Sequence, residues 1–260
     1  MAIDYVLLGV IQGLVEWLPV SSEAAVSLVA VYVAGLGPEA ALRTSIYLHL
    51  GTTAAAALYF RSEVAEAVRA APELLSVGAW RKGRVGFLAV ATVVTGVVGG
   101  AVYALGFDAL SSSQDFLTVI TGLALFLTGI LDLYGSGGGR QVPGWRDSVL
   151  VGVLQGLAAL PGISRSGSTV FGLLMRDFGA SRAFRLSFLA SIPAVLGANL
   201  GLQLIEGFPD VSVASASAGV ATSFVVGYAS IGVLLDVAER FPMYMVAFVL
   251  GLLALLPLLL

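Results

Sequence analysis

Long apolar runs separated by short polar loops make up most of this chain. Six runs approach the roughly twenty residues that a helix needs to cross a bilayer. Two further apolar stretches, 2–36 and 148–180, are broken near the middle by proline and serine, and their pieces of about 15 residues are too short to cross alone. We predict full spans at roughly 44–60, 86–106, 116–134, 185–204, 214–235 and 243–260.

The two broken stretches repeat each other. The segment GVIQGL at 9–14 returns as GVLQGL at 152–157, and each copy then runs into a proline followed by serines. Broken helices at equivalent points of two halves indicate a binding site near the bilayer midplane, because non-helical backbone survives there only around a cavity or inside protein. Each stretch is therefore interpreted as a re-entrant hairpin.

The order of elements predicts an inverted repeat. A hairpin followed by three spans occurs twice, and three crossings place the start of the second half on the opposite side of the membrane. The predicted fold is an all-α integral membrane protein with six transmembrane helices and two re-entrant hairpins. We expect one polytopic domain over 1–260, with inverted-topology repeats at about 1–135 and 145–260.

Composition narrows the chemistry. The chain is 58% hydrophobic and 11% charged, which excludes an ordinary soluble domain. It has no cysteine and a single histidine, so thiol catalysis, disulfides and multi-histidine metal sites are excluded. A divalent cation held by carboxylates, hydroxyls or substrate phosphate would be Mg²⁺ or Ca²⁺. No basic cluster or aromatic stripe suggests nucleic acid as a partner.

The basic residues predict the orientation. This topology places almost all of them on one side, which the positive-inside rule makes cytoplasmic. The exceptions are Arg43, on the other side, and Arg165, inside the membrane. We therefore expect a multi-pass protein of the cell membrane whose two serine-bearing tips meet near the middle. The residues on the basic side are Arg61, Arg69, Arg81, Lys82, Arg84, Arg140, Arg146, Arg176, Arg182, Arg185 and Arg240.

Polar residues surround the first break. Gln12 and Glu16 share one helix face, and a carboxylate inside an apolar helix is costly enough to be functional by default. The structural alternative is that Glu16 ties the hairpin to a neighbouring helix. We expect one of Ser21 and Ser22 to cap the following helix and the other to face the cavity. Glu23 lies in the first turn, where the helix dipole favours an anion.

The second break has the composition of a phosphate-binding loop. Hydroxyls, glycines and an arginine stand together at a helix N-terminus, where free N–H groups and the dipole favour an anion. Arg165 adds a planar fork that matches phosphate oxygens. The alternative for Arg165 is a structural ion pair with Glu16, which substrate phosphate would displace. The other predicted phosphate-binding residues here are Ser164, Ser166, Gly167, Ser168 and Thr169.

Two features remain open from the residues alone. His49, in the first span, is either a general base or a packing residue, and we favour packing because it stands alone in an apolar helix. The pairs Gly96–Gly100 and Gly197–Gly201 have the spacing of close helix contacts, within the chain or in a homodimer.

At the two breaks the chain resembles the undecaprenyl-diphosphate phosphatases, also called bacitracin-resistance phosphatases. The family's first motif, E-G-x-x-E-F-L-P-x-S-S-T-G-H, stands here as QGLVEWLPVSSEAA at 12–25, and its P-G-x-S-R-S-G motif is complete at 161–167. The resemblance covers nearly the whole chain and implies the same fold. It implies removal of the terminal phosphate from a polyprenyl diphosphate, in a site that opens to the extracytoplasmic side.

The resemblance also implies roles for individual residues. Ser22 would be the nucleophile, and Glu16 would act in acid–base chemistry or bind the metal. Arg165 would stabilise the transferring phosphoryl group. Gln12 and Ser21 would join the substrate-binding residues of the second break.

Two departures from the family pattern change the expected chemistry. Gln12 replaces the first glutamate, and Glu23-Ala24-Ala25 replaces T-G-H, so the histidine that would activate the serine is absent from this segment. Serine is a poor nucleophile without a base. Either Glu23 or Glu16 deprotonates Ser22, or a metal held by these two carboxylates activates Ser22 or a water. We hypothesise that Glu23 takes over the role of the missing histidine. We expect the variant motif to serve an archaeal-type polyprenyl carrier.

Two other functions fit the same pattern. Inverted halves with broken helices are also the architecture of transporters, so a polyprenyl-phosphate flippase could use the same phosphate-binding residues without a nucleophile. A lipid-binding homologue without catalytic activity is the third possibility.

Overall fold

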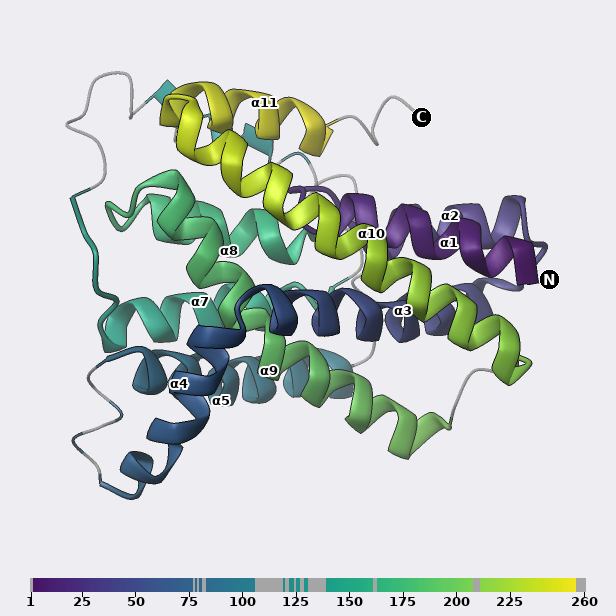
Figure 1. Ribbon diagram of the computed structural model, residues 1–260, viewed down its shortest axis with the longest axis horizontal. Helices are drawn as coiled ribbons and strands as arrows, with labels where there is room; N and C mark the ends of the chain where they lie inside the picture. The colour runs from purple at the N-terminus through teal and green to yellow at the C-terminus, as the bar shows by residue number, and fades with distance from the viewer. Residues whose placement is uncertain are drawn as a thin grey trace.

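A computed structural model of the chain describes residues 2–76, 78, 80, 83–105, 139–160, 163–207 and 211–255, with single positions between 119 and 130. Within these residues the regular elements are all helices (Figure 1). They are α1 (Ala2–Val15), α2 (Ser22–Tyr32), α3 (Pro38–Tyr59), α4 (Arg61–Ala70), the 3₁₀ turn η1 (Ala71–Leu75), α5 (Gly83–Ala104), α7 (Trp145–Leu157), α8 (Arg165–Leu174), α9 (Ala180–Glu206), α10 (Val213–Arg240) and α11 (Met243–Leu255).

Both predicted helix breaks are present. Residues 16–21 separate α1 from α2, and residues 158–164 separate α7 from α8. The second helix of each pair begins after a serine cap, because Ser21 Oγ accepts from Ala24 N–H at 3.3 Å and Ser164 Oγ accepts from Gly167 N–H at 3.1 Å. Figure 1 shows α1 and α7 starting at opposite ends of the molecule and ending near its middle. The two breaks therefore approach each other.

The long helices lie close to the predicted spans. α3, α5, α9 and α10 cover the first, second, fourth and fifth predicted spans, and α11 covers the described part of the sixth. Three of them have the length and hydropathy of membrane spans: Gly83–Ala104, Ala180–Ile205 and Val213–Arg240. The predicted span at 116–134 lies largely outside the described residues.

The glycines of the repeated segment allow close helix contacts. A Cβ atom added to Gly9 would lie 2.4 Å from a backbone oxygen of α10, and one added to Gly152 would lie 2.6 Å from Val94 Cβ on α5. Gly13 and Gly156, one turn later, approach the same two helices equally closely. Each broken pair thus packs its first helix on a long helix of the other half of the chain.

The other glycine pairs make no such contact. Nothing described lies within 4 Å of a Cβ atom added at Gly96, Gly100, Gly197 or Gly201. Among the described residues these glycines do not join helices of the same chain.

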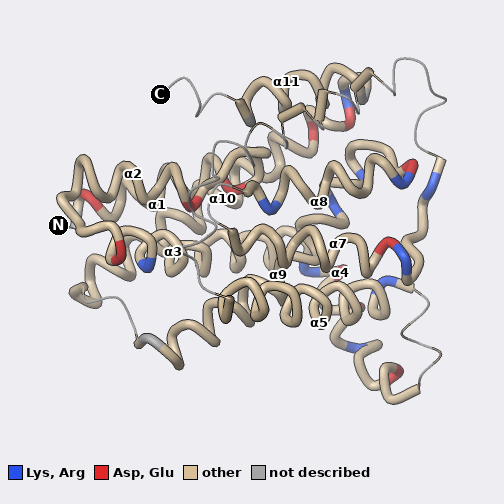
Figure 2. The backbone as a smooth tube through the Cα atoms, turned by 180° about the vertical axis from the view of Figure 1, so that it is seen from behind, with Lys and Arg blue, Asp and Glu red and all other residues tan. Residues whose placement is uncertain are grey.

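Charge separates the two ends of the molecule. Figure 2 shows arginine gathered at the end where α4, α5, α7 and α9 begin. Arg43 belongs to the first turns of α3, which starts at the opposite end (Figure 1), and Arg165 is the first residue of α8. The described basic residues are therefore sorted as the sequence predicted.

A buried tryptophan fixes the first break against the long helices. Trp17 is 2% exposed, and its indole Nε1–H donates to the Gly227 carbonyl and to Ser230 Oγ, both at 3.0 Å. Its ring packs against Phe188 on α9, with 5.0 Å between centroids. The residue next to Glu16 is thus held by α9 and α10.

Candidate active site

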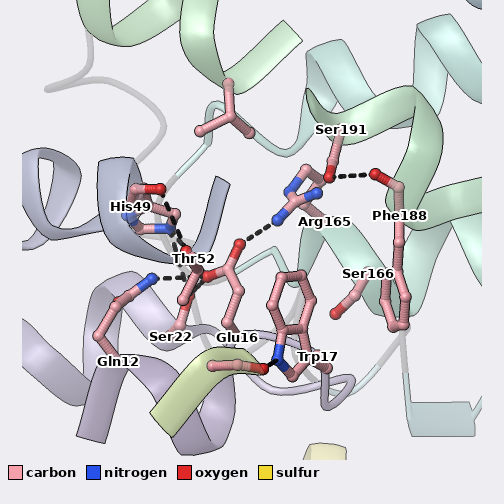
Figure 3. A network of polar contacts seen from close by, with 12 residues as sticks. Gln12, Glu16, Trp17, Ser22, His49, Thr52, Arg165, Ser166, Phe188 and Ser191 are labelled. Atoms are coloured by element: carbon pink, nitrogen blue, oxygen red, sulfur yellow. Dashed lines mark hydrogen bonds and ion pairs between the residues drawn. The ribbon is translucent and has the colours of Figure 1, made fainter. Parts of the chain in front are cut away.

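The carboxylate of Glu16 is the centre of a buried polar network at the first break. Glu16 is 4% exposed, and its Oε2 accepts from Gln12 Nε2 at 2.7 Å and from Ser22 Oγ at 2.8 Å (Figure 3). Its Oε1 accepts from Nη2 of Arg165. One carboxylate therefore connects α1, α2 and α8.

The two serines of the first break have different positions. Ser21 caps α2, whereas the hydroxyl of Ser22, which is 8% exposed, points to Glu16. This division confirms the expectation that one serine caps the helix and the other faces the polar network. Ser22 is thus the hydroxyl available for chemistry.

Arg165 brings the second break into the same network. Its ion pair with Glu16 is present, so the two predicted breaks are joined by opposite charges. The Nη1 atom of the same guanidinium is buried and has no hydrogen-bond partner among the described residues. A buried guanidinium N–H group without a partner is costly, and an anion bound beside it would remove that cost.

His49 is the site residue that the sequence interpretation placed wrongly among packing residues. Its Nε2 lies 3.2 Å from Glu16 Oε2 and 3.4 Å from Ser22 Oγ, and its Nδ1 lies 2.8 Å from the Ser45 carbonyl oxygen. The sequence did contain a signal, since Ser45, His49 and Thr52 form a polar stripe at helical spacing on α3. Because a single histidine in an apolar helix is usually a packing residue, the sequence analysis did not assign this stripe to the site.

Most hydroxyls of the second break are bound within the protein. Ser166 Oγ donates to the Leu18 carbonyl at 2.6 Å, and Ser164 Oγ lies 3.4 Å from the same oxygen. Thr169 Oγ1 lies 2.6 Å from Ser187 Oγ, and Ser168 Oγ donates to the Arg165 carbonyl at 3.2 Å.

The hydroxyls of the second break that were predicted to bind phosphate are bonded to protein groups in this structure. Inside a membrane the backbone carbonyls of a helix break need donors, and the serines supply them. The groups left for an anion are the Arg165 side chain and the N–H groups of Arg165 and Ser166, since Gly167 N–H donates to Ser164 Oγ and Ser168 N–H to the Ser164 carbonyl.

Gly167 has a packing role. A Cβ atom added there would lie 3.0 Å from Pro19 Cβ, so glycine lets the start of α8 approach the tip of the first break. Pro161 and Gly162, which open the same motif, lie outside the described residues.

Glu23 is near the network but is not bonded to it. It interacts electrostatically with His49 and Glu16, while the hydroxyl of Ser22 is bonded to Glu16 and His49 rather than to Glu23. Over the described residues, no three Asp, Glu or His side chains are grouped to hold a metal ion. The buried Oε1 of Gln12 has no hydrogen-bond partner there and is a free oxygen ligand.

Four elements, far apart in sequence, therefore bring together what phosphoryl transfer requires. The Ser22 hydroxyl lies beside an imidazole and a carboxylate, and the guanidinium of Arg165, the first residue of α8, bonds the same carboxylate. Positioned donors that stabilise charge on the transferring group are the main demand of that chemistry.

Known proteins similar to this chain bear on that chemistry. Residues 5–256 match the family described as bacitracin resistance protein BacA. A protein named undecaprenyl-diphosphatase from Haloarcula marismortui is 39% identical over 252 residues, which cover 95% of this chain and 93% of that protein. Proteins of the same name from Methanococcoides burtonii and Methanopyrus kandleri are each 40% identical, over 91% and 96% of this chain and 91% and 94% of their own lengths.

Proposed function

Because the chain belongs to the bacitracin resistance protein BacA family, we propose that it is an undecaprenyl-diphosphatase of the membrane. The substrate is a polyprenyl diphosphate, and the products are the polyprenyl monophosphate carrier and inorganic phosphate. The observation that carries the proposal is the Glu16 carboxylate, which binds the Ser22 hydroxyl and the Arg165 guanidinium at one buried point.

The reaction follows from these contacts. Ser22 Oγ attacks the terminal phosphorus, the bond from that phosphorus to the bridging oxygen breaks, and the lipid monophosphate leaves. Water then attacks the phosphoserine, which releases inorganic phosphate and restores the hydroxyl. Arg165, through its unpartnered Nη1, and the N–H groups at the start of α8 stabilise the charge on the transferring group.

Substrate phosphate and Glu16 compete for the same guanidinium. An arginine buried at this depth needs an anion, and Glu16 supplies it in the free protein. When the diphosphate binds, the unpartnered Nη1 of Arg165 donates to it at once. Nη2 also becomes available when the phosphate displaces the Glu16 carboxylate. The same pair thus stabilises the empty site and opens it to substrate.

A divalent cation fits one side of the network. Gln12 Oε1, Glu16 and Glu23 are the oxygen ligands that would hold Mg²⁺ or Ca²⁺ together with substrate phosphates. The bound cation would neutralise charge on the diphosphate. Glu16 itself remains bonded to Ser22 and keeps that hydroxyl oriented.

The finer architecture is part of the proposal. We infer six spans and two re-entrant pairs, α1–α2 and α7–α8, in inverted repeats of one domain. The opposed directions of the two pairs support this, as does the exchange of packing partners between halves (Figure 1). The basic end faces the cytoplasm by the positive-inside rule, and the site opens to the extracytoplasmic side.

Phosphate release by the purified protein in detergent tests the function. Undecaprenyl or farnesyl diphosphate is supplied with Mg²⁺, with Ca²⁺ or with EDTA. We expect release that EDTA abolishes and that Arg165→Ala lowers by about 100-fold or more. Arg146→Ala, at the exposed start of α7, is the matched control and keeps its rate.

One result would contradict the proposed phosphatase, and another would contradict only its need for a metal. A folded protein that binds the lipid but releases no phosphate would favour the flippase alternative. Phosphate release that persists in EDTA would support the phosphatase and contradict its need for a metal.

A further inference from the structure

We infer that His49 is the general base that removes the proton from Ser22, so the base of this site is supplied by α3 rather than by the segment that carries the serine. The inference rests on the proposed phosphatase function and names the residue that completes it. Three contacts of the imidazole support the inference. Nδ1 contacts the Ser45 carbonyl, and Nε2 contacts both Ser22 and the Glu16 carboxylate.

The first contact fixes the tautomer. Nδ1 of His49 lies 2.8 Å from the Ser45 carbonyl oxygen, and a carbonyl can only accept. Nδ1 therefore carries a proton. In the neutral imidazole this leaves the lone pair on Nε2, which is the nitrogen that faces Ser22.

The second contact gives the proton its route. Nε2 lies 3.4 Å from Ser22 Oγ, a distance that a small movement of the serine on substrate binding would shorten. The proton of Ser22 passes to Nε2 as Oγ forms its bond to phosphorus. The imidazolium then gives this proton to the departing lipid monophosphate. In the second step the neutral Nε2 takes a proton from the attacking water and returns it to Ser22 Oγ as inorganic phosphate forms.

The third contact stabilises the imidazolium that results. Glu16 Oε2 lies 3.2 Å from the same Nε2, so the protonated ring finds a carboxylate beside the proton it has gained. Glu16 is the weaker candidate for base because it already accepts from Gln12, Ser22 and Arg165. The Ser22 hydroxyl donates to Glu16 Oε2 at 2.8 Å, so it must turn toward Nε2 before its proton leaves, and the carboxylate then compensates the charge of the ring.

Glu23 is the competing base. It stands next to Ser22 in the sequence, but the Ser22 hydroxyl is not bonded to it. Successive residues at the start of a helix diverge by about 100°, so neighbours in sequence point apart. A residue on a packed neighbouring helix reaches the hydroxyl instead.

The test is the pH dependence of turnover by the full-length protein in detergent, on undecaprenyl diphosphate, for wild type, His49→Gln and Glu23→Gln. The charged groups that act on His49 are Glu16 on α1, Glu23 on α2 and Arg165 on α8. The rise of turnover with pH therefore reports the titration of this coupled cluster and not of one residue. The base is identified by the variant in which this rise disappears, not by the pH of its midpoint.

We expect His49→Gln to lower kcat by about 10²- to 10⁴-fold, to change KM by less than about threefold, and to lose the rise of turnover with pH. We expect turnover of Glu23→Gln still to rise with pH, even if its rate is lower than that of the wild type. Loss of this rise in Glu23→Gln, or a His49→Gln protein that keeps it, would overturn the inference. If His49→Gln fails to fold, Glu23→Gln still tests the inference, because loss of the rise with pH in that variant would overturn it. An inactive wild type would instead refute the proposed function.

Discussion

At the scale of single residues, one carboxylate organises the site. Burying Glu16 in an apolar interior would cost several kcal/mol if it had no partner, and Arg165, Gln12, Ser22 and His49 together offset that cost. These partners come from both halves of the chain. Glu16 is therefore a structural link, and the proposed function gives it a part in the chemistry as well, so the structural and functional interpretations of this residue are compatible.

The two neighbouring serines should respond differently to truncation. Ser22→Ala removes the hydroxyl bonded to Glu16, and we expect turnover to fall by about 10³-fold or more while the fold is kept. Ser21→Ala removes the cap of α2, and we expect a loss of about 1 kcal/mol in stability and a far smaller loss of rate. Phosphate release and thermal unfolding of both proteins check this. Equal rate losses in the two would contradict the assignment.

At the scale of elements, the broken helices are positioned by close contact rather than by long apolar faces. The repeated glycines bring α1 against α10 and α7 against α5, and Gly167 brings the start of α8 against Pro19. Ser166 then bonds the Leu18 carbonyl across the gap between the two breaks. The polar residues of the second break thus hold the two tips together, and Arg165 is left to face the substrate.

The contact at Gly9 gives a test of this packing. Gly9→Ala would place a methyl group 2.4 Å from a backbone oxygen of α10, and we expect a loss of about 1–3 kcal/mol and reduced turnover. Gly96→Ala is the matched control, because none of the described residues lies within 4 Å of the added carbon, and removing a helix glycine adds up to about 1 kcal/mol of stability. Thermal unfolding in detergent measures both; equal melting temperatures would contradict the close contact of α1 with α10.

A charged clamp holds the outer end of the second broken pair. Asp147, at the start of α7 and before the apolar stretch, accepts from Arg140 at 2.9 Å and from Arg176 at 2.7 Å. Burial alone would raise the pKa of Asp147, but the hydrogen bonds from Arg176, Gly144 N–H and Arg140 outweigh it and lower the pKa below its ordinary value. The folded state therefore favours the ionised carboxylate.

This shift predicts the sign of a pH effect on stability. The contribution of Asp147 is fully present above the ordinary carboxyl pKa and is lost as pH falls through the lower folded value. We expect Asp147→Asn to be less stable than wild type by about 1–3 kcal/mol at neutral pH, and the difference to shrink under acid conditions. Melting temperatures of the two proteins across pH measure it. A difference that grows on acidification would refute the clamp.

At the scale of the whole molecule, charge and symmetry together set the orientation. Arginine gathers at one end of the bundle, and one broken pair starts from each end (Figures 1 and 2). Because the pairs enter from opposite ends, their breaks meet at mid-depth, where water is scarce and an ion pair is retained. In the proposed architecture, a site in this position would accept the lipid diphosphate from within the membrane plane.

The absence of cysteine from the chain makes this orientation easy to test. Glu39→Cys, on the exposed start of α3, should react with a membrane-impermeant maleimide in intact cells. Glu73→Cys, in the exposed turn η1 at the basic end, should react only after the membrane is permeabilised. The unmodified protein is the control, and the reverse pattern of labelling would refute the proposed orientation.

Several features could be predicted from the sequence because they depend on local physics. Apolar length predicted the long helices, and proline with serine predicted both breaks and the cap at Ser21. An ionisable residue in an apolar helix needs a partner, which is why the sequence alone could pair Glu16 with Arg165. Each of these follows from the cost of exposing polar groups to lipid.

Other features depended on which helices lie side by side. His49 stands in a helix whose sequence gives no sign of what it faces, and only the packing of α3 on α2 places its ring beside Ser22 and Glu16. The same packing directs Ser164 and Ser166 to a backbone carbonyl of the other break. Local sequence determined where helices begin, break and carry charge; tertiary contacts between distant segments decided which polar groups bond to each other and which remain for the substrate.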